Sequence, residues 1–217
     1  MVTAGPTRER IDPVRYITND SSGKQGLAIA NAAKSKGATV TLIAGPNVEP
    51  TNPEIFRIDV ESAIEMNNAV QEHIVGTHLF IGVAAVADYR PANFMSEKIK
   101  RHGNNSLTNL ELTENPDIIA NVAKVKNRPI IVGFAAETND PLKHAKEKRI
   151  RKGIDAIIVN DVSDPSIGFN STENAATLIH QGGEIILTKQ SKISLGAELI
   201  DQLETIFTLS KRQKSLR

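Results

Sequence analysis

The chain has 217 residues, of which 40% are hydrophobic and 24% charged, and its formal net charge is +1. This is the composition of an ordinary globular protein that can bury a substantial core. The absence of cysteine excludes disulfides, thiolate metal sites and a cysteine nucleophile. A near-neutral charge and few aromatic residues argue against nucleic-acid binding.

Membrane insertion and export are also disfavoured by the sequence. No apolar run approaches the roughly 20 residues of a membrane span. The opening segment, MVTAGPTRER, lacks the pattern of a signal peptide. We therefore expect a cytoplasmic protein that does not enter a membrane.

Short apolar strands alternate with helices along most of the chain, which is typical of a parallel sheet covered on both faces. The expected strands are 2–4, 39–44, 79–87, 130–132 and 154–159. The expected helices are 23–36, 61–72, 118–125, 142–152 and 195–209, with Ser21 and Ser22 as candidate N-caps of the first. Segments 175–179 and 184–188 predict a β-hairpin. We expect an α/β fold, a Rossmann-like three-layer sandwich in a single domain 1–217, with a hairpin element at about 160–190 and a basic tail at 210–217.

Candidate ligand contacts gather at the predicted strand ends. Ligands of open α/β sheets bind at the carboxyl ends of the strands. The predicted ends are 3–7, 45–46, 84–88, 133–137 and 160–161, and several combine small residues with one acid or amide. Small residues let a ligand approach the backbone, although for any single alanine tight packing of strand against helix is the better explanation.

Two common phosphate-binding motifs are absent. Ser22-Gly23-Lys24 resembles the end of a P-loop, but Gln25 follows it and Thr18 stands in place of the first glycine. The G-x-G-x-x-G fingerprint is also missing, and the second strand ends at Gly45 rather than at an acid, which disfavours NAD. The helix start at residues 21–23 still offers backbone N–H groups to an anion. The local sequence fits an ordinary N-cap equally well.

Two basic clusters stand out in a nearly neutral chain. The first comprises Lys98, Lys100 and Arg101, and the second lies in residues 143–152, where Lys148 and Lys152 share a helix face. Taken alone, each is best explained as a solvated surface. The five histidines show no metal-ligand spacing, so we expect no metal held by protein side chains.

Several ordered motifs together resemble one enzyme family. They are TAGPTRERIDPVRYITNDSSGKQG, AAVADYRP, SEKIK, NPDI, VGFAAET, KRIRK and NDVSDPSIGFNS. They span residues 2 to about 188 and resemble phosphopantothenate–cysteine ligase, the C-terminal half of a bifunctional bacterial protein of coenzyme A biosynthesis. The resemblance implies that CTP activates 4′-phosphopantothenate as an acyl-cytidylate, which L-cysteine then attacks to give phosphopantothenoylcysteine, CMP and pyrophosphate.

The resemblance also implies roles for individual residues. Asn19 falls on the family's active-site asparagine, whose amide can donate to the developing oxyanion, and Lys98 on a lysine that neutralises phosphate charge in the first half-reaction. The implied CTP contacts are Gly82, Val83, Ala84, Asp88, Lys98, Pro116, Asp117, Ile118, Ile119, Phe134, Lys148 and Lys152. The candidates for phosphopantothenate binding are Arg15, Asn19, Ser21, Ser22 and Ala85. For Arg15, Ser21 and Ser22, the anion site at the helix start supports this role as much as the resemblance does.

Cofactors and partners follow from the same resemblance. Mg²⁺ is expected with CTP, and a homodimer is expected through strands in the second half of the chain. The family's bifunctional protein carries a flavin-dependent decarboxylase half that this chain lacks, so we expect an excised domain that binds no flavin. Asp20 departs from the histidine that many relatives carry after the active-site asparagine.

Two other functions stay open at this stage. A Rossmann-type nucleotide- or flavin-binding oxidoreductase is the first, although the missing glycine and ribose-acid signals weigh against it. A non-catalytic nucleotide-binding or assembly module is the second. It predicts CTP binding without turnover.

Overall fold

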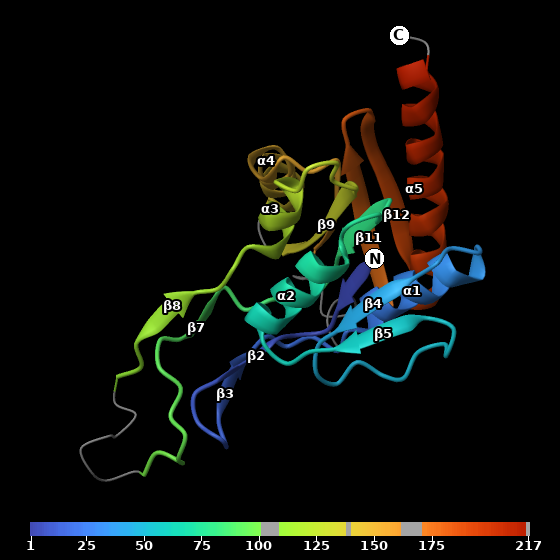
Figure 1. Cartoon of the computed structure of the whole chain (residues 1–217). Helices are drawn as coiled ribbons and strands as arrows, with labels where there is room; N and C mark the ends of the chain where they lie inside the picture. Colours follow the sequence, from blue (N-terminus) through green and yellow to red (C-terminus); the bar gives the residue numbers. More distant parts are fainter. Residues whose placement is uncertain (101–108, 138–139, 162–170, 216–217) are drawn as a thin grey trace.

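A computed structural model of the chain describes residues 1–100, 109–137, 140–161 and 171–215, and gives only the backbone of Glu137, Asp161 and residues 207–215. An eight-stranded sheet forms its centre, in the order β12-β11-β10-β9-β6-β1-β4-β5 (Figure 1). Its strands are β1 Val2–Ala4, β4 Thr41–Ala44, β5 Phe56–Asp59, β6 Leu79–Gly82, β9 Ile130–Glu137, β10 Ala156–Asp161, β11 Glu173–His180 and β12 Gly183–Ser191.

The sheet is mainly parallel, as the apolar strands predicted. The six strands from β5 to β10 run parallel, and β11 and β12 form the expected antiparallel hairpin. Neighbouring residues of one strand contribute to opposite faces: Ile158 packs into one core cluster, and Ile157 and Val159 pack into another. This alternation follows from the two-residue period of a strand and requires helices on both sides.

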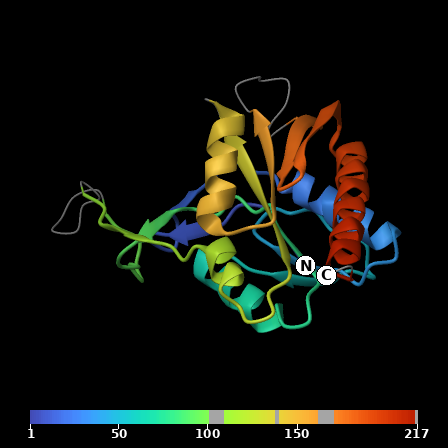
Figure 2. The ribbon, with the colours of Figure 1, turned by 90° about the horizontal axis from the view of Figure 1, so that it is seen from above.

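The five helices cover the two faces of the sheet (Figure 2). Helices α1 Lys24–Ser35 and α5 Lys192–Ser215 lie on one face, and α2 Ala63–His73, α3 Ile118–Ala123 and α4 Pro141–Lys152 lie on the other. Gly196 of α5 lets the two helices of the first face touch, since a Cβ there would lie 2.9 Å from the backbone carbon of Ala28. The three-layer sandwich expected from the sequence is therefore confirmed.

Two short antiparallel ribbons extend from one end of the sheet and were not expected from the sequence. They are β2 Arg8–Arg10 with β3 Tyr16–Thr18, and β7 Tyr89–Pro91 with β8 Leu112–Glu114. We call these four strands the ribbon arm; Figure 1 shows it projecting from the body. Strands of three residues carry too short a hydrophobic pattern to be recognised in a sequence.

Several expected boundaries were wrong. The strand predicted at 79–87 ends at Gly82, β9 continues past Val132 to Glu137, and β5 was missed. The last helix runs to Ser215, so most of the expected basic tail continues it, in keeping with the high helix propensity of lysine, arginine and glutamine. No helix in the described part of the chain combines the length and apolar character that a membrane span requires.

Candidate functional site

The first motif of the chain brings the start of α1 against the end of β1. Gly5 and Gly23 both have positive φ angles, 84° and 71°. A Cβ on Gly23 would lie 3.0 Å from the Cα of Gly5 and 2.7 Å from Cγ2 of Val48, and a Cβ on Gly5 would lie 2.5 Å from the same Val48 atom. Only two glycines satisfy both the backbone conformation and this close approach.

The segment that follows β6 runs beside the end of β1 instead of continuing the strand. The buried hydroxyls of Thr3 and Thr7 accept hydrogen bonds from the backbone N–H of Ala84 (3.3 Å) and Ala87 (3.0 Å). The N–H of Ala85 donates to the carbonyl of Gly5 at 2.9 Å. These bonds give the backbone N–H groups of residues 84, 85 and 87 partners outside the regular hydrogen bonding of the sheet. They therefore hold residues 84–87 as a loop at the end of the strands.

Asn19 lies against this loop. Its side-chain Nδ2 donates to the carbonyl oxygen of Ala85 at 3.0 Å, and the residue is exposed. The bond brings together the predicted catalytic asparagine and Ala85, which are 66 positions apart in the sequence. The amide therefore stands at the strand-end edge on which the other predicted contacts lie.

A cavity of about 200 Å³, which we call the α4 pocket, collects most of the predicted CTP contacts. Ten of the twelve line it: Gly82, Ala84, Asp88, Pro116, Asp117, Ile118, Ile119, Phe134, Lys148 and Lys152. Val83 lines a neighbouring cavity, and Lys98 lines neither. Residues far apart in the sequence thus meet at one edge of the sheet.

A glycine lets helix α3 lie close to the sheet beside the α4 pocket. Gly82 of β6 pairs with Gly133 of β9. A Cβ on Gly82 would lie 3.0 Å from the side chain of Ile119, whereas a Cβ on Gly133 would lie 3.6 Å from it, an ordinary van der Waals distance. Gly82 therefore lets Ile119 of α3 pack tightly on the sheet, and both residues line the pocket.

The polar wall of the α4 pocket carries both signs of charge. Asp117 caps α3 by accepting from the N–H of Ala120 at 3.0 Å, and Lys152 pairs with the same carboxylate at 3.1 Å. Asn115, which sequence reasoning missed, donates through Nδ2 to the carbonyl of Ala87 (2.8 Å), and its N–H donates to the carbonyl of Asp88 (2.8 Å). Asn115 thereby fixes the backbone that presents Asp88.

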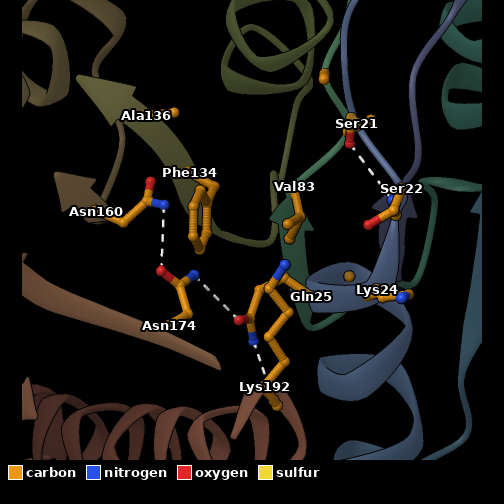
Figure 3. Close-up of a pocket in the computed structure, with 14 residues that line it drawn as sticks. Ser21, Ser22, Lys24, Gln25, Val83, Phe134, Ala136, Asn160, Asn174 and Lys192 are labelled. Carbon is orange, nitrogen blue, oxygen red and sulfur yellow. Dashed lines mark hydrogen bonds between the residues drawn. The ribbon is translucent and has the colours of Figure 1, made fainter. Parts of the chain in front are cut away.

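A second cavity of about 120 Å³, which we call the α1 pocket, lies at the start of α1 (Figure 3). Ser21, Ser22, Val83 and Ala85 line it, as the resemblance implied for the substrates together. Neither serine caps the helix: Gly23 occupies the N-cap, no side chain caps α1, and the Ser21 Oγ accepts from the N–H of Gly23 at 3.4 Å. The N-cap expectation is wrong because the contact with Gly5 requires glycine there.

Four polar residues of the α1 pocket were missed by sequence reasoning: Lys24, Gln25, Asn174 and Lys192. Burial lowers the pKa of the Lys192 ammonium, and the charge of Lys24 lowers it further. Lys192 follows the last strand directly, outside any expected strand end, so the sequence offered no signal for it. Ala84 and Phe134 line both pockets, which are therefore adjacent.

Three basic residues singled out in the sequence, Arg15, Lys98 and Lys100, line neither pocket. Lys98 and Lys100 are exposed, and Arg101 lies outside the described residues. Arg15, a candidate for phosphopantothenate, instead donates from Nη2 to the carbonyl of Ile99 at 2.7 Å and lies 3.6 Å from the carboxylate of Asp12. Arg15 thus holds the segment that carries Lys98.

Asp12 also holds the segment that carries Lys98. Its buried carboxylate accepts backbone N–H bonds from Val14 and Arg15 at 2.8 Å and from Ile99 at 3.2 Å. Burial alone would raise the pKa of Asp12, but these bonds and the charge of Arg15 lower it below its ordinary value.

In the described ranges, no three histidine, aspartate or glutamate side chains gather into a group that could hold a metal.

Replacing Asp12 by asparagine should destabilise the domain in a pH-dependent way. A lowered pKa means that the carboxylate stabilises the fold fully above its unfolded-state pKa of about 3.9, and that this contribution is lost as the pH falls through the folded-state value. Urea midpoints of Asp12→Asn and the unaltered protein should differ at neutral pH and converge on acidification. Asp59→Asn, at an exposed carboxylate paired with Arg57, is the control. A gap that does not narrow in acid would contradict the assignment.

Comparisons with known proteins place the chain in a family. The DNA/pantothenate metabolism flavoprotein C-terminal domain matches residues 1–207. The coenzyme A biosynthesis bifunctional protein CoaBC of Escherichia coli (strain K12) is 50% identical over 216 residues, which cover 98% of this chain and 53% of that protein. The chain thus spans about half the length of the curated relatives it matches.

Solved structures agree with this placement. The C-terminal domain of a CoaBC protein superposes with a TM-score of 0.79 at 35% identity, covering 95% of this chain and 93% of that one. A Cab2 mutant in complex with phosphopantothenate-cysteine has the same fold, with a TM-score of 0.77 at 14% identity over 96% of this chain and 87% of its own. The chain therefore belongs to the family of the DNA/pantothenate metabolism flavoprotein C-terminal domain, the phosphopantothenate–cysteine ligase domain that its sequence resembles.

Proposed function

We propose that this domain ligates L-cysteine to 4′-phosphopantothenate at the expense of CTP, as a step of coenzyme A biosynthesis in the cytoplasm. A carboxylate oxygen of phosphopantothenate attacks the α-phosphorus of CTP, and the bond to the β-phosphate breaks to release pyrophosphate. The cysteine amine then attacks the acyl carbon of the acyl-cytidylate. An amide forms, CMP leaves with the electrons of the broken C–O bond of the mixed anhydride, and the amine loses a proton to solvent.

The observation that carries this proposal is the adjacency of the two pockets. Ala84 and Phe134 line both, so a nucleotide in one and an acyl substrate in the other would meet across these two residues. An acyl-cytidylate is a single molecule that needs such a continuous site. Holding both reactants at one edge supplies the proximity on which a two-substrate reaction depends.

The α4 pocket suits the nucleotide. Phe134 offers an aromatic surface to the base, and Asp88 and Asp117 offer acceptors to ribose hydroxyls or to the amino group of cytosine. Lys148 and Lys152 add positive charge for phosphate oxygens. Mg²⁺ would arrive with CTP, held chiefly by phosphate oxygens and water as this ion prefers. Asp88 and Asp117 are the exposed carboxylates among the described residues that line the pocket. The ion would neutralise phosphate charge during activation.

The α1 pocket suits phosphopantothenate. The start of α1, without a side-chain cap, presents backbone N–H groups and the positive end of the helix dipole beside Ser21 and Ser22. Asn19 lies next to Ala85 on the border of this pocket, where its amide can turn to the oxygen of the acyl group. An amide donor aimed at that oxygen stabilises the charge that develops as cysteine attacks.

The relatives support the same assignment. The Escherichia coli relative takes part in coenzyme A biosynthesis by its name, and the Cab2 mutant binds phosphopantothenate-cysteine. Since the chain covers about half of the bifunctional relatives, we also propose that a flavin-dependent decarboxylase occupies the other half of the full-length protein. No flavin is assigned to this half.

Pyrophosphate release from CTP and phosphopantothenate, with and without cysteine, tests the function. Release without cysteine, followed by CMP and the cysteine adduct once cysteine is added, is expected. Reduction of nicotinamide or flavin by the domain would favour the oxidoreductase instead, and CTP binding without any release would favour a non-catalytic module.

Asn19→Ala should block ligation more than activation, because the amide acts on the second transition state. Loss of such a donor typically lowers the rate by about 100-fold or more. The acyl-cytidylate should still form and accumulate, as quenched-flow analysis with labelled CTP would detect. Asn68→Ala, at an exposed position of α2 outside both pockets, should behave as the unaltered domain. Equal loss of both half-reactions would remove the role assigned to Asn19.

Lys98→Gln should instead suppress activation, because one positive charge is lost from the neutralisation of the triphosphate. A decrease in pyrophosphate release of at least about tenfold is expected. Lys126→Gln, at another exposed lysine, is the matched control. Normal release by the Lys98 variant would take this residue out of the mechanism.

We also propose that the domain forms a homodimer, for which two surfaces compete. The expected hairpin contributes the edge strand β12, with Ile186 77% exposed. The ribbon arm and its connections carry more exposed large apolar side chains: Val14, Tyr16, Tyr89, Phe94, Leu110 and Leu112. Light scattering should give a dimer, and Ile186→Lys should dissociate it if β12 forms the interface. Dissociation by Leu112→Lys alone would move the interface to the arm, and a monomeric starting protein would exclude both.

A further inference from the structure

Asn115 stands where the ribbon arm joins the α4 pocket. Strands β7 and β8 of the arm pair in antiparallel fashion up to Tyr89 and Glu114 (Figure 1), and Asn115 follows directly. Its backbone N–H continues the pairing by donating to the carbonyl oxygen of Asp88 at 2.8 Å. Pro116 comes next and has no N–H with which to extend it. The two segments therefore part here, one toward β6 and the other toward α3.

The side chain of Asn115 takes over where the backbone pairing stops. Its Nδ2 donates to the carbonyl oxygen of Ala87 at 2.8 Å. One residue thus bonds to two successive carbonyls of the opposite segment. Ala87 is buried, so its carbonyl depends on a donor from the protein. The amide of Asn115 therefore keeps the backbone of residues 87 and 88 in place.

The orientation of this amide is fixed from both sides. Arg90 of β7 donates from Nη1 to the Oδ1 of Asn115 at 3.2 Å, and the same nitrogen donates to the carbonyl oxygen of Glu114. A guanidinium can only donate hydrogen bonds, and a carbonyl can only accept them. The Oδ1 must therefore face Arg90 and the Nδ2 must face Ala87, because an amide turned over would lose both bonds.

This arrangement bears on one pocket only. Asp88 and Asn115 both line the α4 pocket, as do Ala87 and Pro116, and none of the four lines the α1 pocket. Asp88 is exposed, so the backbone that carries it decides where its carboxylate stands. A binding site requires its contact residues to be held in place by supporting residues of this kind.

We propose that Asn115 is a positioning residue for CTP, whose amide holds the backbone of Ala87 and Asp88 so that the Asp88 carboxylate meets the nucleotide. Asn115 acts through Asp88 and needs no contact of its own with the nucleotide. This inference rests on the proposed function, which assigns CTP to the α4 pocket, and deepens it. Phosphopantothenate is assigned to the α1 pocket, so its binding should not depend on Asn115.

Asn115→Ala and the isosteric Asn115→Asp test this role, because both remove the donor to Ala87 and the first adds no charge. Each should raise KM and the calorimetric Kd for CTP by about tenfold, the scale of one hydrogen bond between the nucleotide and a carboxylate. The kcat at saturating CTP should stay close to that of the unaltered domain, which is the signature of lost binding rather than lost chemistry. KM for phosphopantothenate should not change.

Asn121→Ala is the matched control. The Nδ2 of Asn121 in α3 donates to the Oδ1 of Asn67 in α2 at 3.0 Å, and neither residue lines a pocket. The control variant loses an amide hydrogen bond between two elements, as Asn115→Ala does. It should nevertheless bind CTP as the unaltered domain does.

A double variant separates positioning from a general loss of structure. Asp88→Asn alone should weaken CTP binding. Adding Asn115→Ala to it should weaken binding by no more than about a further twofold, because the residue through which Asn115 acts is already lost. Fully additive losses would mean that Asn115 acts on something other than Asp88 and would overturn the inference.

The outcomes keep this inference apart from the proposed function. Normal CTP affinity in both Asn115 variants of an active domain would overturn the inference alone, as would equal weakening of CTP and phosphopantothenate. An unaltered domain that binds no CTP would overturn the proposed function and the inference with it. Thermal unfolding establishes that the variants fold, and Asn115→Asp carries the test if Asn115→Ala does not fold.

Discussion

The contact between Gly5 and Gly23 is the constraint on which the rest of the site depends. It brings the N-terminus of α1 within van der Waals distance of the end of β1, a distance that no side chain larger than hydrogen allows. In β1 and directly after it, the hydroxyls of Thr3 and Thr7 and the carbonyl of Gly5 accept hydrogen bonds from the backbone of residues 84–87. Residues of this loop line both pockets, so one close backbone contact helps to shape two cavities.

The division of the core into two clusters explains why the pockets differ. The α1 pocket opens on the face covered by α1 and α5, and the α4 pocket opens on the face covered by α2, α3 and α4. Each takes its chemistry from the helices on its own side: helix starts and buried amides in one case, an acid–lysine pair in the other. Phe134 and Ala84 line both pockets and so connect the two.

The sequence predicted the features that depend on long or regular patterns. Apolar runs such as residues 154–159 and the hairpin around Gly183 were recognisable because their periodicity extends over enough residues. The ribbon arm was missed because its strands have three residues each. The loop after Gly82 was predicted as strand because Val83 to Ala87 is as apolar as a strand. Its path depends on hydrogen bonds to residues 3–7, which are distant in sequence.

The candidate site was predictable to a similar extent. Motif resemblance named residues such as Asp88 and Lys152 that the fold brings to one cavity. Lys192 and Asn174 were not predicted, because Lys192 begins the last helix and Asn174 lies in the hairpin. Neither stands at the carboxyl end of a parallel strand, where ligands are expected. Ser21 and Ser22 line the pocket as expected but do not cap the helix, because tertiary contact at Gly23 overrides local capping preference.

The α1 pocket has a consequence for how the protein is made. Its Gln25 donates to the carbonyl oxygen of Lys192 and accepts from Asn174, each at 3.3 Å, which joins the first helix of the chain to the last strand pair and the last helix. Gly196 packs on Ala28 in the same region. A chain that ends at β10 contains Ser21 and Ser22 but lacks Asn174 and Lys192, which complete the α1 pocket. The pocket can therefore form only after α5 has been synthesised, and until then α1 lacks the helix that packs against it.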